Sequence, residues 1–230
     1  MTLILLAAGT SSRFELNVKK QWLRINHKPL WQFVADRLQA TTLFSKIIIT
    51  SNAADIEYMK NYAEYTFVVG GNSRQESLKN ALEEVKTEYV LVSDIARACI
   101  NESFLSRIIA KKNDADCIVP YLQVTDTIVY VNQTIDRDQI KRVQTPQLSR
   151  TLVLKDALKT DIEFTDESSA IVSNGGTREF ILGEDDAHKI TYIQDLNKIP
   201  CLEKPSTDTL SGTGFDVHAF EDGGIMFLGG

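Results

Sequence analysis

The chain has 230 residues, of which 43% are hydrophobic and 24% are charged, a composition that is ordinary for one well-buried α/β domain. Its formal net charge of −6 argues against a general nucleic-acid binder, because such proteins normally carry a basic face. The apolar stretches fall far short of the roughly 20 residues of a membrane span, and no signal peptide is visible. We therefore expect a cytoplasmic protein with neither nucleic acid nor membrane as partner.

The first residues form an apolar run, residues 3–8, that opens into Gly9, three small residues and Arg13. Continuous apolar residues predict a buried strand of a parallel sheet, since an exposed strand would alternate. Small side chains let backbone N–H groups approach a ligand closely, and an arginine supplies charge for phosphate. A strand that ends in such a turn is where α/β proteins bind nucleotides, so the turn predicts a nucleoside triphosphate site.

Strand-like and helix-like stretches then alternate as far as residue 120. Short apolar runs predict buried strands at residues 46–51, 65–69, 89–93 and 116–120. Helical spacing of apolar residues predicts helices at residues 29–40, 54–62, 74–85 and 102–111. Ser73 or Asn72 would cap the third of these helices. The alternation predicts a mostly parallel sheet that is covered by helices on both faces.

The pattern changes after Pro120. Residues 125–131 and 140–144 read as two strands around a polar stretch and predict a hairpin-like arm that would serve dimerisation. We expect two further helices at residues 151–158 and 166–173, and Gly175-Gly176 would end the second of them. A last strand is expected at residues 178–182. A polar, proline-containing linker at residues 203–211 would end the domain of residues 1–202. The arm occupies about residues 121–147, and residues 212–230 are too short to fold alone.

The three cysteines, Cys99, Cys117 and Cys201, show neither paired nor metal-type spacing. We therefore expect reduced, buried thiols, as is usual in a cytosolic protein.

Charged residues gather after the predicted strands. Lys19 and Lys20 follow the first turn, where cations suit a reaction in which negative charge grows on phosphoryl oxygens. A second glycine turn at residues 70–77 opens a helix, whose N-terminus favours anionic groups. Asp94 ends another strand, where its carboxylate would hold a divalent cation such as Mg²⁺ beside a triphosphate. The first turn lacks both the Gly-Lys-Ser/Thr of a P-loop and the G-x-G-x-x-G fingerprint, which disfavours a dehydrogenase.

Taken together, these segments resemble the 2-C-methyl-D-erythritol 4-phosphate cytidylyltransferase family of non-mevalonate isoprenoid synthesis. The family pattern runs A-A-G-x-G-x-R, P-K-Q, G-G-x-x-R-x-x-S, D-A-A-R, D-T, T-P-Q and T-D-E. Its counterparts here, in order, are Ala7-Ala8-Gly9 with Arg13, Lys20-Gln21, Gly70-Gly71 with Arg74 and Ser77, Asp94 with Ala96-Arg97, Asp126-Thr127, Thr145-Pro146-Gln147 and Thr165-Asp166-Glu167. The chain departs from the pattern at Ser11 and Lys19, where the family has glycine and proline, and at Ile95 and Ala98, where it has alanine and proline.

The resemblance implies a three-layer Rossmann-like nucleotidyltransferase fold, with a mixed, mostly parallel sheet and a protruding β-arm. It implies an enzyme that transfers CMP from CTP to 2-C-methyl-D-erythritol 4-phosphate and releases pyrophosphate. Magnesium or another divalent cation would accompany the CTP. Another alditol or sugar phosphate as acceptor, such as ribitol phosphate, and a non-catalytic CTP-binding protein stay open as alternatives.

Site roles follow from the same resemblance. Arg13 and Lys20 would be catalytic by stabilising charge on the α-phosphate of CTP, together with Arg137 and Lys189. The expected nucleotide-binding residues are Ala7, Ala8, Gly9, Gly71, Asn72, Ser77, Asp94 and Ile95. The expected residues for methylerythritol phosphate are Thr127, Arg137, Thr165 and Lys189. In the family, the arginine that matches Arg137 reaches the site of a partner subunit, which implies a homodimer formed through the arm.

The stretch Gly212-Thr-Gly-Phe-Asp-Val-His218 resembles the opening of a methylerythritol cyclodiphosphate synthase domain, which some bacteria fuse behind this cytidylyltransferase. In that family the Asp-x-His pair binds a divalent metal together with a further histidine. Asp216 and His218 match the pair, but no third ligand follows before Gly230, and a catalytic zinc site normally has three protein ligands. We read residues 212–230 as a truncated start of that second domain and expect no cyclase activity from this chain.

Overall fold

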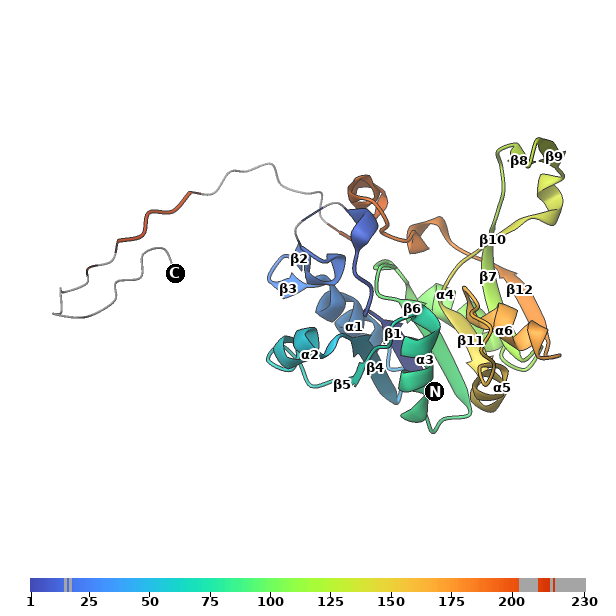
Figure 1. Ribbon diagram of the computed structural model, residues 1–230, viewed down its shortest axis with the longest axis horizontal. Helices are drawn as coiled ribbons and strands as arrows, with labels where there is room; N and C mark the ends of the chain where they lie inside the picture. Colours follow the sequence, from blue (N-terminus) through green and yellow to red (C-terminus); the bar gives the residue numbers. More distant parts are fainter. Residues whose placement is uncertain (15, 17, 203–210, 216, 218–230) are drawn as a thin grey trace.

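An eight-stranded sheet forms the middle layer of the computed structural model, which describes residues 1–14, 16, 18–202, 211–215 and 217 (Figure 1). The strand order is β10-β7-β11-β6-β1-β4-β5, with β12 beside β7. The strands are β1 (Thr2–Leu6), β4 (Lys46–Ser51), β5 (Thr66–Val69), β6 (Tyr89–Asp94), β7 (Cys117–Gln123), β10 (Lys141–Val143), β11 (Gln147–Arg150) and β12 (Arg178–Leu182). β1 runs parallel to both β4 and β6, while β10 and β11 run antiparallel to their neighbours. The predicted mixed, mostly parallel sheet is confirmed.

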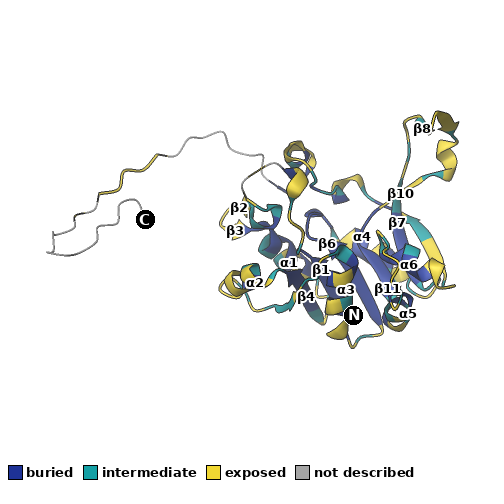
Figure 2. Ribbon diagram, viewed as in Figure 1, coloured by how far each residue is buried: buried dark blue, intermediate teal, exposed yellow. Residues whose placement is uncertain are grey.

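Helices cover both faces of the sheet. They are α1 (Leu30–Ala40), α2 (Ala53–Met59), α3 (Arg74–Glu83), α4 (Glu102–Ala110), α5 (Thr151–Ala157) and α6 (Glu167–Ser173), with 3₁₀ turns η1 (Ser12–Phe14), η2 (Lys20–Trp22), η3 (Arg137–Gln139), η4 (Asp185–Ala187) and η5 (Ile193–Lys198). Alternate residues of β1 point to opposite faces, so Leu3 and Leu5 pack with α1 and α4 whereas Ile4 and Leu6 pack with α3, α5 and α6. The buried centre between these two helical layers is dark in Figure 2. Within the described residues, no helix combines the length and apolar character that a membrane crossing needs.

The predicted helices and the last strand occur within a few residues of their expected limits. Ser73 is the cap of α3, because its hydroxyl accepts a hydrogen bond from the N–H of Glu76 at 3.1 Å. Gly175 ends α6 with a φ of +84°, which is the left-handed conformation that favours glycine. The predicted linker lies almost wholly outside the described residues, so the domain limits stay a prediction.

The arm pairs differently from the predicted hairpin. Its two expected strands do not pair with each other: β8 (Ile128–Tyr130) pairs with β9 (Gln133–Ile135), and β10 pairs with the end of β7. The reason is a two-residue turn at Val131 and Asn132, whose φ values of +46° and +64° reverse the chain at once, as a type I′ hairpin does. The arm therefore stands on β7 and β10 and projects β8 and β9 away from the sheet (Figure 1).

Outside the arm, one strand of the main sheet and one short hairpin were not predicted. β11 begins at the glutamine of the Thr-Pro-Gln motif and lies between β6 and β7, where its polar residues Gln147 and Ser149 are buried. A short hairpin of β2 (Arg24–Ile25) and β3 (Lys28–Pro29) precedes α1. Neither shows the apolar run or the alternation that marks a strand in sequence.

The prediction of three reduced thiols is wrong for two of them. Cys99 and Cys201 form a disulfide with a Cα–Cα distance of 5.6 Å. They are 102 residues apart, and only the fold brings the loop after β6 against the segment after η5. Cys117 is free and buried as predicted, and burial raises the pKa of its thiol.

Candidate active site

The candidate site lies where β1 and β6 end. β4 lies on one side of β1 and β6 on the other, so the carboxyl ends of these strands form the kind of switch point at which open α/β sheets bind ligands. A cavity of about 600 Å³ opens there. The predicted residues that line it are Ala7, Ala8, Gly9, Arg13, Lys20, Gly71, Asn72, Ser77, Asp94, Ile95 and Lys189.

The first turn is fixed at both ends. The N–H of Ala7 donates to the carbonyl of Thr50 in β4 at 3.0 Å, which holds the turn to the sheet. Phe14 is buried in the core and its N–H donates to the carbonyl of Ser11 at 2.9 Å. Arg13 lies beside this anchor and is exposed, so its guanidinium is free to meet a ligand.

The second glycine turn packs directly on the first. A side chain at Gly70 would come within 2.5 Å of the Cβ of Ala8, so glycine is needed there for the close approach. The N–H of Gly71 donates to the hydroxyl of Ser77 at 3.0 Å, and the N–H of Asn72 donates to the carboxylate of Glu76 at 2.7 Å. Both amides thus point at oxygen acceptors at the N-terminus of α3, as they would toward an anionic ligand.

Lys20 reaches the cavity from η2. The end of this turn is held by Trp22, whose ring packs against Trp31 at 6.3 Å and Tyr62 at 6.0 Å between ring centroids. The Lys20 ammonium donates to the carbonyl of Ile190 at 3.0 Å. Burial lowers the pKa of Lys20, and the nearby charges of Lys189 and Arg13 lower that pKa further. The cations therefore repel one another in the absence of an anion.

Asp94 is the centre of a charged network at the end of β6. One of its carboxylate oxygens accepts from Lys189 at 2.5 Å, and the other accepts from the Nε of Arg74 at 3.3 Å. Burial alone would raise the pKa of Asp94, but the charges of Arg74 and Lys189 outweigh it and lower the pKa to about 2. Asp94 is therefore ionised at neutral pH.

Glu167 extends this network into the core. The guanidinium of Arg74 donates to Oε1 of Glu167 at 2.7 Å, and the glutamate side chain is 0% exposed. Its second oxygen, Oε2, is buried without a hydrogen-bond partner. Burial raises the pKa of Glu167 against the opposing charge of Arg74. Arg74 and Glu167 belong to the sequence motifs, but sequence reasoning gave them no role.

A second cavity of about 350 Å³ shares Lys189 with the first. Its wall is rich in basic side chains, namely Arg97, Arg142, His188, Lys189 and Lys198. Arg97 is fixed there by bonds to the carbonyl of Ala187 at 2.6 Å and to the hydroxyl of Thr145 at 2.9 Å. Apart from Lys189, these residues were not predicted as site residues. Only Arg97 had a signal in the sequence, as the last residue of the D-x-A-R motif.

Three predicted residues do not line either cavity. Thr127 and Arg137 lie on the arm, where the Arg137 guanidinium donates to the carbonyl of Thr125 at 2.5 Å. Thr165 is exposed just before α6. The predicted metal pair Asp216 and His218 lies outside the described residues.

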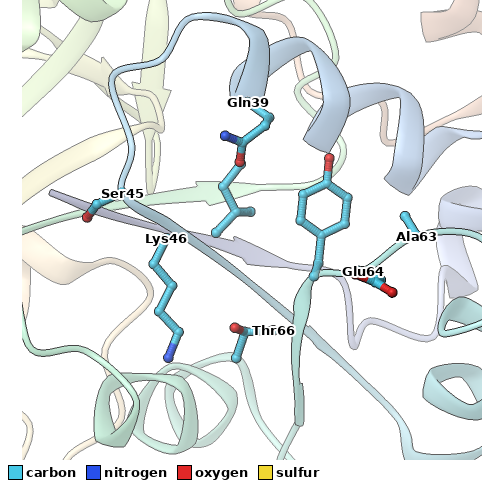
Figure 3. A pocket seen from close by; sticks show the side chains of 8 residues that line it. Gln39, Ser45, Lys46, Ala63, Glu64 and Thr66 are labelled. Atoms are coloured by element: carbon cyan, nitrogen blue, oxygen red, sulfur yellow. The ribbon is translucent and has the colours of Figure 1, made fainter.

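A further hollow, of about 430 Å³, lies at the other end of the strands, where β4 and β5 begin (Figure 3). It is formed at the end of α1 and the starts of β4 and β5, and in the figure its labelled side chains come from these separate segments without converging. Lys46 there is paired with Glu84 at 3.0 Å, and Tyr65 donates to Asp36 at 2.7 Å. Ligands of open α/β sheets bind at the carboxyl ends of strands, which favours the first cavity as the active site.

The residues that line the cavity could hold a divalent cation only if a bound nucleotide supplied further ligands. Asp94 is the one carboxylate among the described residues that line the first cavity. In the part of the chain that is described, no group of three or more His, Cys, Asp or Glu side chains is arranged to hold a metal ion. Mg²⁺ commonly binds through one or two carboxylates together with substrate phosphates, so a single aspartate suits a cation that arrives with a nucleotide.

The sheet, the two glycine turns and the basic cavity define an α/β protein of the Rossmann-like nucleotide-binding class. Comparison with known proteins makes this specific, because the family model of IspD, 2-C-methyl-D-erythritol 4-phosphate cytidylyltransferase, matches residues 1–201. The chain therefore belongs to the 2-C-methyl-D-erythritol 4-phosphate cytidylyltransferase family, which acts as a transferase in the non-mevalonate pathway. The predicted fold and enzyme class are confirmed.

Individual relatives agree with this assignment. The bifunctional enzyme IspD/IspF of Sulfurimonas denitrificans is 67% identical over 230 residues, which are 100% of this chain and 60% of that protein. The bifunctional IspDF structure from Campylobacter jejuni is 45% identical with a TM-score of 0.83, over 86% of this chain and 54% of that one. The cytidylyltransferase structure from Francisella tularensis is 26% identical with a TM-score of 0.71, over 85% and 96% of the two chains. The chain thus spans about 60% of the length of its bifunctional curated relative.

Proposed function

We propose that this cleft transfers CMP from CTP to 2-C-methyl-D-erythritol 4-phosphate and releases pyrophosphate. The observation that supports this most is the meeting of Arg13, Lys20 and Lys189, from three separate segments, in one cavity beside the two glycine turns. With Arg74, which also lines the cavity, four cationic side chains surround it, and such a cluster suits a reaction between two highly charged anions. Family membership supplies the identity of the two substrates.

In the proposed reaction, a phosphate oxygen of the acceptor attacks the α-phosphorus of CTP. The new P–O bond forms as the bond from the α-phosphorus to the bridging oxygen breaks, and pyrophosphate leaves with that electron pair. The attacking phosphate is already ionised near neutral pH, so no side chain has to remove a proton. Arg13 and Lys20 would stabilise the charge on the α-phosphate, and the backbone of residues 7–9 and 71–72 would orient the nucleotide, with Ser77, Asp94 and Ile95 completing the wall.

The acceptor would occupy the second cavity. Lys189 lies in the wall of both cavities and would contact both reacting phosphates. Arg97, Arg142 and Lys198 add positive charge on the side where an anionic acceptor would lie. Thr127, Arg137 and Thr165 are proposed as further acceptor contacts. The first two lie on the projecting arm, so we propose that they act in the site of a second copy of the chain.

A homodimer formed through the arm is therefore part of the proposal. Its support is a run of apolar side chains near the arm turn: Val129, Tyr130 and Val131 are 62%, 68% and 76% exposed. Consecutive exposed apolar residues on a projecting element mark an interaction surface. The test mixes two inactive variants, Arg13→Ala and Arg137→Ala, refolded together.

If Arg137 acts across the dimer, each mixed dimer contains one intact site, and about a quarter of the wild-type activity returns with random pairing in a two-fold dimer. If Arg137 acts on its own chain, mixing restores nothing. Each variant alone, taken through the same refolding, is the control.

We propose Mg²⁺ as the cation that accompanies CTP, with Asp94 as its protein ligand. Bound there, it would neutralise charge on the phosphate oxygens. Lys189 contacts one oxygen of Asp94 and Arg74 contacts the other. Together they would hold the carboxylate in place at the end of β6 until the nucleotide binds.

Pyrophosphate release tests the whole assignment. The enzyme is assayed with CTP and methylerythritol phosphate, and ribitol phosphate replaces the acceptor as the control. Release with methylerythritol phosphate alone supports the proposal. Release with ribitol phosphate alone assigns a different alditol phosphate, and binding of CTP without release in either case indicates a non-catalytic CTP-binding protein.

Two remaining expectations concern the cell and the rest of the protein. We propose a cytoplasmic enzyme, although a disulfide such as Cys99–Cys201 is more usual in oxidising compartments, so cell fractionation is the test. We also propose that Asp216 and His218 belong to the metal site of a second, cyclase domain, as the names of the bifunctional relatives suggest. This chain assayed alone should show no cyclase activity.

A further inference from the structure

Ser11 has an unfavourable backbone conformation in the first turn. Its φ is +60°, in the left-handed region that is costly for residues with a Cβ and free for glycine. Such a conformation persists only where surrounding contacts hold it. The contacts of the Ser11 side chain therefore show what holds this backbone conformation.

The hydroxyl of Ser11 joins the first turn to the turn that bears Lys20. Its Oγ accepts a hydrogen bond from the backbone N–H of Lys20 at 3.0 Å and donates to Oε1 of Gln21 at 3.3 Å. The Gln21 amide in turn donates to the carbonyl of Gly9 at 3.4 Å. Gln21 is only 1% exposed, so this bridge between Gly9, Ser11 and the 20–21 segment closes away from water.

We propose that Ser11 is a positioning residue, whose hydroxyl fixes the backbone of Lys20 so that the Lys20 ammonium stays in the phosphate cavity. This inference rests on the proposed function. Ser11 itself lines the cavity, so a direct contact with the nucleotide is the competing role, and an unchanged KM for CTP distinguishes an effect that passes through the Lys20 N–H.

The electrostatics explain why Lys20 needs such a restraint. The Lys20 ammonium is partly buried and lies near the like charges of Arg13 and Lys189. The carboxylates of Asp94 and Asp195 and the hydrogen bond to the carbonyl of Ile190 oppose these effects only in part, because the pKa of Lys20 is lowered on balance. Before an anion binds, the ammonium would therefore gain by turning toward water. Trp22 anchors η2 through its ring contacts, but that anchor lies two residues beyond Lys20. The Ser11 hydroxyl bonds to Lys20 itself.

The test compares Ser11→Ala with Ser11→Asn. Alanine keeps a Cβ but removes the hydroxyl, whereas asparagine tolerates a left-handed φ and offers a side-chain oxygen to the Lys20 N–H. We expect Ser11→Ala to lower kcat of pyrophosphate release about tenfold, the effect of about one hydrogen bond, with the KM for CTP within about twofold of wild type. Ser11→Asn should recover most of the loss. Ser106→Ala, at an exposed serine of α4, is the matched control.

Two readouts separate positioning from loss of structure. A released Lys20 moves into water and its pKa rises, so the alkaline limb of kcat against pH should shift to higher pH in Ser11→Ala. The melting temperature should fall by no more than about 4 °C, the shift that loss of one hydrogen bond produces in a domain of this size. A shifted limb with a melting temperature inside that range supports the proposal. An unshifted limb, or a kcat within twofold of wild type, overturns it.

A direct probe of Lys20 keeps this inference separate from the proposed reaction. Acetic anhydride modifies only the neutral amine of accessible lysines, so peptide mass spectrometry follows the rate at Lys20 as a function of pH, and the limiting rate at high pH reports accessibility independently of the pKa. Ser11→Ala should raise that limiting rate about tenfold if loss of the hydrogen bond to the backbone N–H of Lys20 releases its side chain. An unchanged rate refutes the restraint even if the wild-type enzyme proves inactive, and inactivity of the wild type with a raised rate refutes only the reaction.

Discussion

Replacing Arg74 with alanine is expected to destabilise the fold strongly, in a way that depends on pH. The substitution removes the charge that Glu167 contacts at 2.7 Å, although that glutamate side chain is 0% exposed. A buried carboxylate without its partner costs several kcal/mol, so Glu167 would take up a proton instead. Removal of a buried partner of this kind typically costs about 3–5 kcal/mol.

Protonation sets an upper limit on the part of the loss that comes from Glu167. At pH 7.5 the carboxyl is three pH units above its ordinary pKa of 4.5, and each unit is worth about 1.4 kcal/mol, so the limit is about 4 kcal/mol. At pH 5.5 the same limit is about 1.4 kcal/mol. A carboxyl whose pKa is raised in the fold binds its proton more tightly there than in the unfolded chain, so the loss grows as pH rises above 4.5.

Urea unfolding of wild type and Arg74→Ala at the two pH values measures this loss. We expect about 3 kcal/mol at pH 7.5 and about 1 kcal/mol at pH 5.5. The double variant Arg74→Ala/Glu167→Gln, which lacks the buried charge, should recover about 2 kcal/mol at pH 7.5. Arg107→Ala breaks the more exposed pair with Glu184 and should cost less than about 1 kcal/mol at either pH. A loss that is equal at both pH values, or no recovery in the double variant, would refute the reasoning.

Three further predictions concern the cleft and the core. Arg13→Ala or Lys20→Ala should lower kcat of pyrophosphate release at least about a hundredfold without changing the melting temperature, and turnover near wild type in both would contradict the assigned roles. Dithiothreitol, or Cys99→Ala, should lower the free energy of unfolding by about 3 kcal/mol, since the bond to Cys201 closes a long loop; identical urea midpoints with and without reductant would count against the disulfide. Because the pKa of Asp94 is lowered to about 2, its stabilisation is present above its ordinary pKa of 3.8 and is lost as pH falls toward 2; acid unfolding curves of wild type and Asp94→Asn should converge in that window, and parallel curves would be the contrary result.

The sheet and its two helical layers were predictable because their signals are local. Continuous apolar runs such as residues 46–51 and the helical spacing of residues 102–111 report burial directly. β11 gave no such signal, since Gln147 and Ser149 are polar and become buried only between β6 and β7. The arm pairing was missed because it depends on the positive φ of Val131, which a β-branched residue rarely adopts.

The meeting in one cavity of the residues that we propose to bind the nucleotide was predictable to the same extent. Its residues follow the ends of strands, and a parallel sheet brings those ends together whatever the details of packing. The second cavity, which we propose for the acceptor, was harder to predict, because Arg142 and Lys198 reach it from a strand and a 3₁₀ turn that are distant in sequence. Glu167 was matched as a motif residue, but its contact with Arg74 spans 93 residues and needed the fold to become visible.

The departures from the family pattern also acquire a physical meaning. Ser11 replaces a glycine yet keeps a φ of +60°, and Lys19 replaces a proline yet keeps a φ of −65°, the value that a proline ring imposes. The backbone path is therefore the one that glycine and proline favour. The side chain of Lys19 forms an ion pair with Asp55 at 2.8 Å, a contact that a proline could not make.

The disulfide has a mechanical consequence. Cys201 is joined covalently to Cys99, which lies five residues after Asp94 in the loop that leaves β6. Tension on the polypeptide beyond Leu202 is thus borne first by a covalent link to the loop that follows β6, and not by the hydrogen bonds of η5. A force applied from that direction would reach the loop after β6 through the disulfide before it could separate η5 from the core.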